Sequence, residues 1–156
     1  MFTRSRYVLR GLSSAAAILS ALAATAAFAA GPKAYVGNFK DNTVSVIDTE
    51  AGKVVATVPV AAGPHGMAIT QDGRTVYVSG DGSSSVDVID TATDKVVKTI
   101  NVGKAPNGVA LTPDDRLLVV TVYGEDRIAF IDTSTQTVVA NMGVPKPHTV
   151  AISPNG

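Results

Sequence analysis

A tetrapeptide that returns at a fixed interval constrains this chain more than any other feature of its sequence. VIDT occupies residues 46–49 and 88–91, and a close copy, FIDT, occupies residues 130–133. Longer stretches follow the same step or one residue less: GPHGMAIT begins at residue 63, APNGVALT at residue 105 and KPHTVAIS at residue 146. Self-similarity at a period of about 40–50 residues is typical of proteins built from one supersecondary unit that is stacked on its own copies.

Each repeat divides into four short segments with the composition of β-strands. In the second copy the segments are GMAIT at 66–70, TVYVSG at 75–80, SVDVID at 85–90 and VVKTINV at 96–102. β-Branched residues dominate them, and TVYVSG alternates apolar with smaller or polar residues, as half-buried strands do. Glycine and aspartate fill the connections, where tight turns need them. We therefore predict an all-β fold made of β-propeller blades, each a sheet of four antiparallel strands.

The first 29 residues, 1–29, have the composition of a secretory signal peptide. Three arginines precede an uncharged run rich in alanine and serine, and Ala-Phe-Ala at 27–29 fits a cleavage site. A membrane anchor is the alternative, but alanine and serine partition weakly into lipid. We expect a periplasmic or secreted protein that has no stable membrane insertion once the signal is cleaved.

The remaining residues, 30–156, are predicted to form one repeat domain. Its repeats span residues 34–62, 63–104 and 105–145, and residues 146–156 supply the first strand of a further blade. This part holds 13 acidic and 10 basic residues and no cysteine. A net negative charge argues against nucleic acid as a partner, because nucleic-acid binding needs a concentrated basic surface. The lack of cysteine excludes disulfides and thiolate metal sites.

The repeats resemble the YVTN-type β-propeller family, also described as 40-residue β-propeller repeats. The resemblance is carried by YVGN at 35–38, YVSG at 77–80, SVDVIDTATDKVVKTINVG at 85–103 and PNGVALTPDD at 106–115. No copy contains a literal YVTN, and VVTV at 119–122 departs furthest. The resemblance implies a secreted or periplasmic ring of six to eight blades. It does not imply one function, since such propellers include binding proteins, lactonases and cofactor-bearing oxidoreductase subunits.

Three blades are too few for a closed ring, which needs about four to eight. The chain begins at the second strand of a blade and ends after the first strand of another. Three outcomes follow: the chain is a fragment of a longer propeller, or two copies form a head-to-tail homodimer that completes a six-blade ring, or an open arc exists alone. An open arc would expose apolar faces and unpaired strand edges.

Three residues at equivalent repeat positions are the candidate ligand-binding residues: His65, Asn107 and His148. We expect them in the loop before the first strand of each blade, which leads to the central channel. Imidazole and amide groups there could contact a polar ligand or a metal. The structural alternative is a proline-led turn with a tolerant polar residue. We expect the two histidines to lie too far apart to share a metal, and we assign no metal site, cofactor or catalytic residue.

Asp48, Asp90 and Asp132 end the third strand of their repeats, and each precedes a threonine. An Asp-Thr pair can accept and donate hydrogen bonds to nearby backbone groups and so begin a turn. A ring of metal ligands is the alternative, but such ligands must converge within a few ångströms. We expect the turn.

Two functions fit these observations. The first is a non-catalytic binding or scaffold module, with a protein or a small molecule as its unidentified ligand, because the turns vary more between copies than the strands. The alternative is a fragment of a propeller enzyme, a lactonase-like hydrolase or a cofactor-carrying oxidoreductase subunit. An enzyme needs residues that break the repeat, and Glu125 and Arg127, which do, form no catalytic arrangement with their neighbours.

Overall fold

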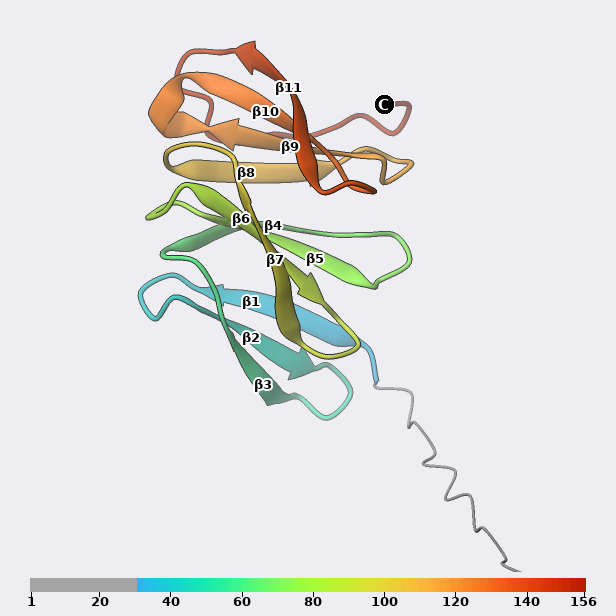
Figure 1. The fold of residues 1–156 in the computed structure, drawn as a ribbon. Coiled ribbons are helices and arrows are strands. Elements are labelled where there is room, and N and C mark those ends of the chain that lie inside the picture. The colour runs from blue at the N-terminus through green and yellow to red at the C-terminus, as the bar shows by residue number, and fades with distance from the viewer. Residues whose placement is uncertain (1–30) are drawn as a thin grey trace, which may run out of the picture.

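The computed structural model describes residues 31–156, and the predicted signal peptide lies outside this range. It contains three antiparallel sheets, shown in Figure 1. Their strands are β1 (Lys33–Asn38), β2 (Thr43–Asp48), β3 (Lys53–Pro59), β4 (Pro64–Ile69), β5 (Thr75–Gly80), β6 (Ser85–Asp90), β7 (Lys95–Asn101), β8 (Pro106–Leu111), β9 (Leu117–Val122), β10 (Arg127–Asp132) and β11 (Thr137–Gly143). A single 3-10 turn, η1 (Tyr123–Glu125), joins β9 to β10. No helix within residues 31–156 has the length and apolar character needed to cross a membrane.

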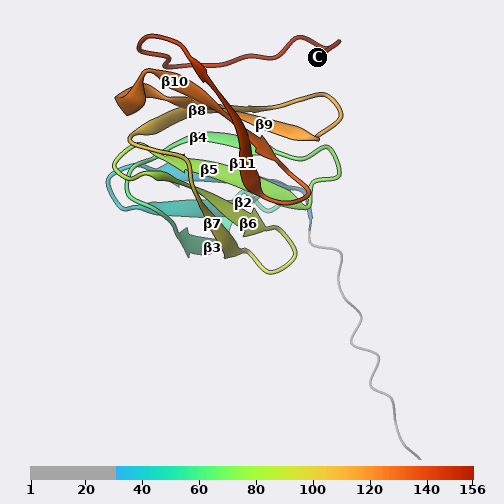
Figure 2. The same ribbon diagram turned by 45° about the horizontal axis from the view of Figure 1, so that its top comes forward.

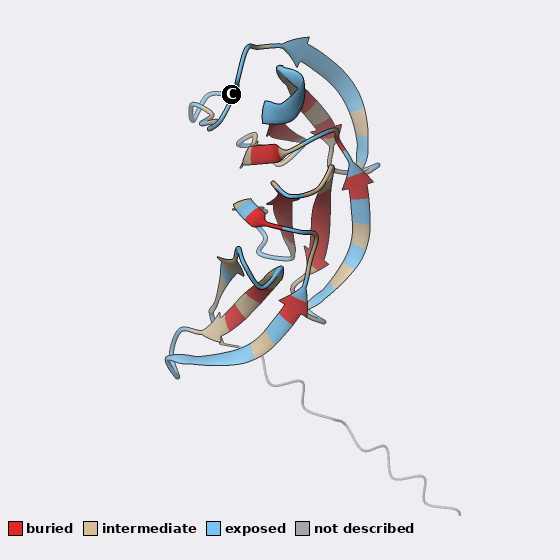
Figure 3. Cartoon of the chain, turned by 90° about the vertical axis from the view of Figure 1, so that its left-hand side faces the viewer, coloured by how far each residue is buried: buried red, intermediate tan, exposed pale blue. Residues whose placement is uncertain are grey.

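Each sheet is a meander in which consecutive strands are neighbours. The first sheet has the order β1-β2-β3, the second β4-β5-β6-β7 and the third β8-β9-β10-β11. The sheets are stacked so that β4 and β8 lie against each other on the inner side, while β3, β7 and β11 follow the convex outer side of an arc (Figures 2 and 3). These are the blades of an incomplete β-propeller, and the predicted fold class is confirmed.

The core consists of two apolar layers, one between each pair of neighbouring sheets. Val44, Val46 and Ile89 belong to the layer between the first and second sheets, and Val88 and Leu118 to the layer between the second and third. All five are fully buried. Burial of such a side chain stabilises the fold by about 1.5–3 kcal/mol, so each blade depends on its neighbour for its stability.

The recurring tetrapeptide contains a β-bulge. The pairing of the third strand with the fourth shifts between Val46 and Ile47, and the same shift recurs in the second and third sheets after Val88 and Phe130. A bulge adds a residue to one strand and increases the local twist. It therefore turns each outermost strand away from the blade in the same manner.

The Asp-Thr pair that ends the tetrapeptide closes a turn, as predicted. Asp48 accepts hydrogen bonds from the backbone N–H groups of Glu50 and Ala51, at 2.9 and 2.8 Å. Asp132 likewise accepts from the backbone of Thr135, at 2.8 Å. The threonine that follows each aspartate hydrogen-bonds to an earlier turn of the same blade. The hydroxyl of Thr91, for example, donates to the carbonyl of Gly73 at 2.7 Å. The repeated residues thus tie two turns of one blade together.

A polar clasp joins the first blade to the second. The ammonium group of Lys33 lies 2.7 Å from a carboxylate oxygen of Asp94, and the Tyr35 hydroxyl donates to the other oxygen at 2.8 Å. Burial raises the pKa of the Tyr35 phenol well above its usual range, and the hydrogen bond to Asp94 raises it further. The phenol therefore stays protonated and donates to Asp94.

The C-terminal residues differ from the prediction. Residues 146–156 were expected to form the first strand of a further blade, but no residue after Gly143 is in a strand. Only the turn forms, since the N–H of Gly156 donates to the carbonyl of Ser153 at 3.0 Å. A strand exists through its ladder of hydrogen bonds to a neighbour, and the second strand that should pair with this segment is not in the described chain.

Candidate functional site

The innermost strands meet at a junction built from one small residue and one hydroxyl. The Ser79 hydroxyl of β5 donates to the carbonyl of Asn107, and the backbone N–H of Gly66 donates to Ser79 at 2.9 Å. Gly66 has no side chain because a Cβ there would collide with the Asn107 carbonyl. Glycine thus allows the close approach of β4 and β8, which sets the position of Asn107.

The same junction recurs one blade later. The Thr121 hydroxyl of β9 donates to the carbonyl of His148 at 2.9 Å, and the N–H of Gly108 donates to the same carbonyl at 3.0 Å. Gly108 is equivalent to Gly66, because a Cβ at this position would lie only 2.8 Å from the His148 carbonyl oxygen. His148 is therefore held where an innermost strand would begin, although no strand forms.

The structure places the three predicted residues at the N-terminal ends of the innermost strands. His65 and Asn107 are the second residues of β4 and β8, so the expectation that they lie in loops is wrong for both. The side chains of His65 and His148 are exposed, whereas Asn107 is buried, with 4% of its surface accessible.

The two histidines lie side by side. Their ring centroids are 5.5 Å apart, with the planes at 83°. The expectation that the two histidines lie too far apart to share a metal is wrong about their distance, because innermost strands converge on the propeller axis and bring the ends of non-adjacent strands together. Within residues 31–156, no group of three or more histidine, cysteine or acidic side chains could hold a metal ion.

A second set of repeat-equivalent residues contacts the first, and the sequence analysis missed it. Phe39, Asp81 and Tyr123 follow the second strands of their blades at the 42-residue step. Phe39 lies against the ring of His65, with centroids 6.5 Å apart, and Tyr123 against His148, at 6.1 Å. The 42-residue spacing identifies this set once the turns that follow the second strands are aligned in the same way as the innermost strands. Together the six side chains form what we call the axial cluster: Phe39, His65, Asp81, Asn107, Tyr123 and His148.

The middle pair of the axial cluster is polar where the outer pairs are aromatic. The amide nitrogen of Asn107 donates to a carboxylate oxygen of Asp81 at 2.7 Å. The amide oxygen of Asn107 is buried and has no hydrogen-bond partner among the described residues. An unpaired buried acceptor costs about 1–3 kcal/mol, and buried polar atoms in folded proteins are nearly always paired. This oxygen is the chemically unsatisfied atom of the cluster.

Lys146 borders the axial cluster: its ammonium group lies 5.2 Å from the centroid of the Tyr123 ring and 3.5 Å from a carboxylate oxygen of Asp126. A cation over an aromatic face is attracted by the ring, by about 0.5–1 kcal/mol at an exposed position. The cluster thus combines exposed rings with a carboxylate and one buried, unpaired acceptor.

The two residues that break the repeat form a brace between loops. Arg127 pairs with Glu125 at 2.9 Å and also donates to the carbonyl of Val102. The backbone N–H of Lys104 donates to Glu125, and this hydrogen bond lowers the pKa of the Glu125 carboxyl, assisted by Arg127. Their bonds hold the loop of the preceding blade in place, so they serve the structure.

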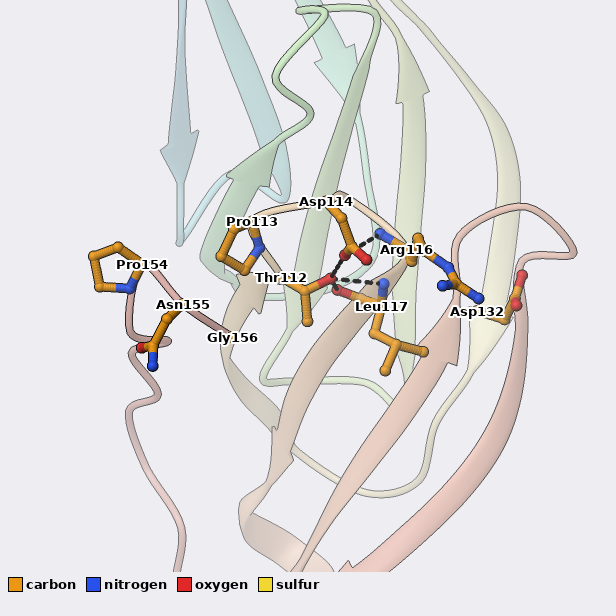
Figure 4. A pocket seen from close by; sticks show the side chains of 9 residues that line it. All are labelled: Thr112, Pro113, Asp114, Arg116, Leu117, Asp132, Pro154, Asn155 and Gly156. Carbon is orange, nitrogen blue, oxygen red and sulfur yellow. Dashed lines mark hydrogen bonds between the residues drawn. The ribbon is translucent and has the colours of Figure 1, made fainter.

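A pocket lies beside the turn that joins β8 to β9, as Figure 4 shows. Its volume is about 480 Å³, and it opens between the turn around Pro113 and the C-terminal residues Pro154 and Asn155. Between the second and third blades the same position is bridged: Gln71 donates from its backbone to Asp115 at 2.6 Å and from its side chain to the Pro113 carbonyl. The pocket therefore lies between the third blade and the C-terminal segment, where no such hydrogen bonds join the two parts within residues 31–156.

Comparisons with known proteins agree with the fold. The chain is similar to a chain of Kuenenia stuttgartiensis hydrazine synthase, with 31% identity, a TM-score of 0.77, and coverage of 81% of this chain and 37% of that one. It is also similar in fold to the dihydro-heme d1 dehydrogenase NirN, solved in complex with DHE, with 20% identity, a TM-score of 0.66, and coverage of 72% and 26%. The chain thus spans little more than a third of the hydrazine synthase chain and about a quarter of the NirN chain.

No curated protein matches the sequence. A family model does: the one described as YNCE-like beta-propeller matches residues 13–110, which is more than half of the chain. This match confirms that the chain belongs to a β-propeller family, as the resemblance implied. The chain belongs to the YNCE-like β-propeller family.

Proposed function

We propose that this chain is a secreted or periplasmic binding module, built from YVTN-type repeats, that takes a small molecule at the axial cluster. The observation that carries the proposal is the buried amide oxygen of Asn107, which has no partner within residues 31–156 and belongs to a residue at the same repeat position as two exposed histidines. A ligand that donates a hydrogen bond there would remove the cost of an unpaired buried acceptor.

The chemistry of the cluster favours a flat, unsaturated ligand with an N–H or O–H donor. Phe39 and Tyr123 expose 50% and 39% of their surfaces, and aromatic rings bind best to other flat rings, edge to face or offset. Asp81 adds a negative charge beside Asn107, which also favours a donor over an acceptor. Among residues 31–156 the Asp81 carboxylate is hydrogen-bonded to the Asn107 amide and to neither histidine, an arrangement that supports binding over acid-base catalysis.

The likeness to hydrazine synthase favours a second candidate, the propeller portion of a larger enzyme. In that case the axial cluster would bind the ligand, and parts outside this chain would supply the chemistry. Both candidates require a ligand at the axial cluster, so one experiment tests their shared part.

A titration with indole and N-methylindole tests the site. The two probes have the same flat ring system, but only indole carries an N–H donor. The chain has two histidines, both in the cluster, so their side-chain NMR signals report binding without interference. We expect indole to shift both signals and to bind roughly 3- to 10-fold more tightly than N-methylindole, the worth of one hydrogen bond of about 0.5–1.5 kcal/mol.

Two variants make this titration specific. Asn107→Leu removes the acceptor at nearly constant volume, and it should make the two probes equal. Asn101→Leu changes an exposed asparagine outside the cluster and should leave the difference intact. If neither probe shifts the histidine signals, or if Asn107→Leu keeps the preference for indole, the proposed site is wrong.

A further inference from the structure

Asp81 departs from the residues at its repeat position. The equivalent residues, Phe39 and Tyr123, are aromatic. Aspartates elsewhere in the chain hold turns by accepting backbone hydrogen bonds, as Asp72 does at 3.0 Å. The Asp81 carboxylate accepts no backbone hydrogen bond within residues 31–156, and its main chain alone serves the loop, through an N–H that donates to the Gly63 carbonyl at 2.8 Å. Turn formation therefore does not explain why this residue is an aspartate.

The charge of Asp81 has no countercharge in the described part of the chain. Each of the four ion pairs within residues 31–156 joins two other residues. Lys146, which borders the axial cluster, pairs with Asp126 at 3.5 Å. Of the two Asp81 carboxylate oxygens, one accepts from the Asn107 amide at 2.7 Å, and no residue in the range 31–156 donates to the other. A carboxylate accepts several hydrogen bonds, so this half-buried one can bind a further donor.

A second acceptor lies beside the first. The amide nitrogen of Asn107 donates to Asp81, so the amide oxygen, bonded to the same carbon, lies within roughly 5 Å of the Asp81 carboxylate. This oxygen is buried without a partner among the described residues. A ligand with a single donor would leave one of the two acceptors unsatisfied, whereas a group with several N–H bonds can reach both. The site therefore favours a ligand with several donors at one end.

An aromatic surface borders the same carboxylate. Gly63 lies between Phe39 and the loop of Asp81, because a Cβ at Gly63 would stand 3.2 Å from the Phe39 ring and 3.0 Å from the backbone nitrogen of Gly82. The Phe39 side chain keeps 50% of its surface exposed. A cation near an aromatic face is attracted by the ring. A ligand held by Asp81 therefore meets a surface that also favours positive charge.

We infer that the ligand of the axial cluster is a flat cation of the amidinium or guanidinium class, whose charge pairs with Asp81 and whose N–H groups also reach Asn107. Such a group is planar, carries several N–H donors and stays charged at neutral pH. Its hydrogen bonds to a carboxylate are charge-assisted and about twice as strong as neutral ones. An alkylammonium ion has the charge without the flat shape, and a neutral amide has the shape without the charge. This inference rests on the proposed function, because it names the ligand class of the same site.

The structural explanation of the pair is that Asp81 serves only to hold Asn107. An uncharged amide at position 81 would do this equally well, because its oxygen accepts the same hydrogen bond from Asn107. The two explanations therefore differ in one respect, which is whether the negative charge of Asp81 contributes to binding.

A titration with benzamidinium and benzamide separates the two explanations. The probes have the same ring and nearly the same shape, but benzamidinium carries a positive charge and a second nitrogen donor where benzamide has a carbonyl oxygen. The NMR signals of the two histidines, both in the axial cluster, report binding. We expect benzamidinium to bind roughly 5- to 10-fold more tightly, since a hydrogen bond to a charged group is stronger than a neutral one. Added salt should weaken this preference by screening the charge.

Two matched variants assign the preference to one carboxylate. Asp81→Asn removes the charge and keeps an acceptor for Asn107, so it should abolish the preference for benzamidinium. Asp41→Asn removes an exposed carboxylate from the equivalent loop of the first blade and should leave the preference unchanged. Neutral indole should still shift both histidine signals in Asp81→Asn, which controls for the integrity of the site.

Indole also distinguishes a wrong ligand class from a wrong site. If indole shifts the histidine signals but benzamidinium binds no more tightly than benzamide, or if Asp81→Asn keeps the preference, the cationic ligand is wrong and the binding site stands. If none of the three probes shifts the signals, the proposed site is wrong and the cationic ligand with it. A preference that Asp81→Asn abolishes and Asp41→Asn retains supports the cation.

Discussion

At the scale of single residues, the packing of the blades depends on the absence of a side chain where the innermost strands approach most closely. Gly66 contacts the backbone of β8 at the Asn107 carbonyl and lies near the N–H of Val109, where a Cβ would stand 3.0 Å from the nitrogen. Neither atom can rotate away, because both belong to a paired strand. One glycine thus sets the separation of two blades and the position of the buried amide.

Gly66→Ala should therefore force β4 and β8 apart. We expect a loss of about 1–3 kcal/mol in the free energy of unfolding, the range for overpacking a tight site, measured by urea denaturation. Gly143→Ala is the matched control, since nothing lies within 4 Å of a Cβ added there. An equal, small effect of both substitutions would mean that the blades do not approach as described.

At the scale of elements, the turn after each third strand is held by a carboxylate that accepts local hydrogen bonds. The hydroxyl of Ser134 donates to Asp132 at 2.6 Å, and the N–H of Thr135 donates to it at 2.8 Å. These bonds lower the pKa of the Asp132 carboxyl, the Ser134 hydroxyl most of all. The ionised form is therefore the one that stabilises the turn.

This gives Asp132 a defined effect on stability against pH. Because its pKa is lower in the folded chain than in the unfolded chain, the ionised carboxylate stabilises the fold above the unfolded value of about 3.9. That contribution is lost as the pH falls through the lower folded value.

Asp132→Asn should lower the melting temperature at neutral pH, and its difference from the unmodified chain should vanish in acid. Thermal denaturation followed by circular dichroism over this pH range measures it. Glu50→Gln, at an exposed carboxylate that accepts no hydrogen bond among residues 31–156, should show no such trend. A difference between Asp132→Asn and the unmodified chain that stays constant down to the lowest pH would exclude the carboxylate as the cause.

Strand prediction from the sequence succeeded where each strand has its partner in the same repeat. The segments at 75–80 and 85–90 match β5 and β6 residue for residue, because alternation and β-branched residues reflect a local environment. Strand prediction failed for residues 146–156, although their sequence resembles β4 and β8 as closely as β4 and β8 resemble each other. A ladder depends on a second strand, and no local pattern reveals whether that strand is present.

At the scale of the whole molecule, the period of the sequence predicted the architecture but not the contacts at its axis. The steps of 42 and 41 residues identify His65, Asn107 and His148 as equivalent, yet they give no distance between these residues. Their convergence results from the inclination of successive blades, which a linear sequence does not express. The partners Phe39 and Tyr123 were missed for a related reason, since they lie in turns whose sequences vary between copies.

The central claim is that the repeats are arranged about one axis, so that the starts of the innermost strands meet. A nuclear Overhauser effect between the imidazole protons of His65 and His148 tests it directly, because the chain has two histidines and their rings are 5.5 Å apart. We expect a cross-peak that disappears in His65→Asn, a substitution that introduces the residue found at the equivalent position of the third blade, Asn107. Two resolved histidine spin systems with no cross-peak in the folded chain would contradict it.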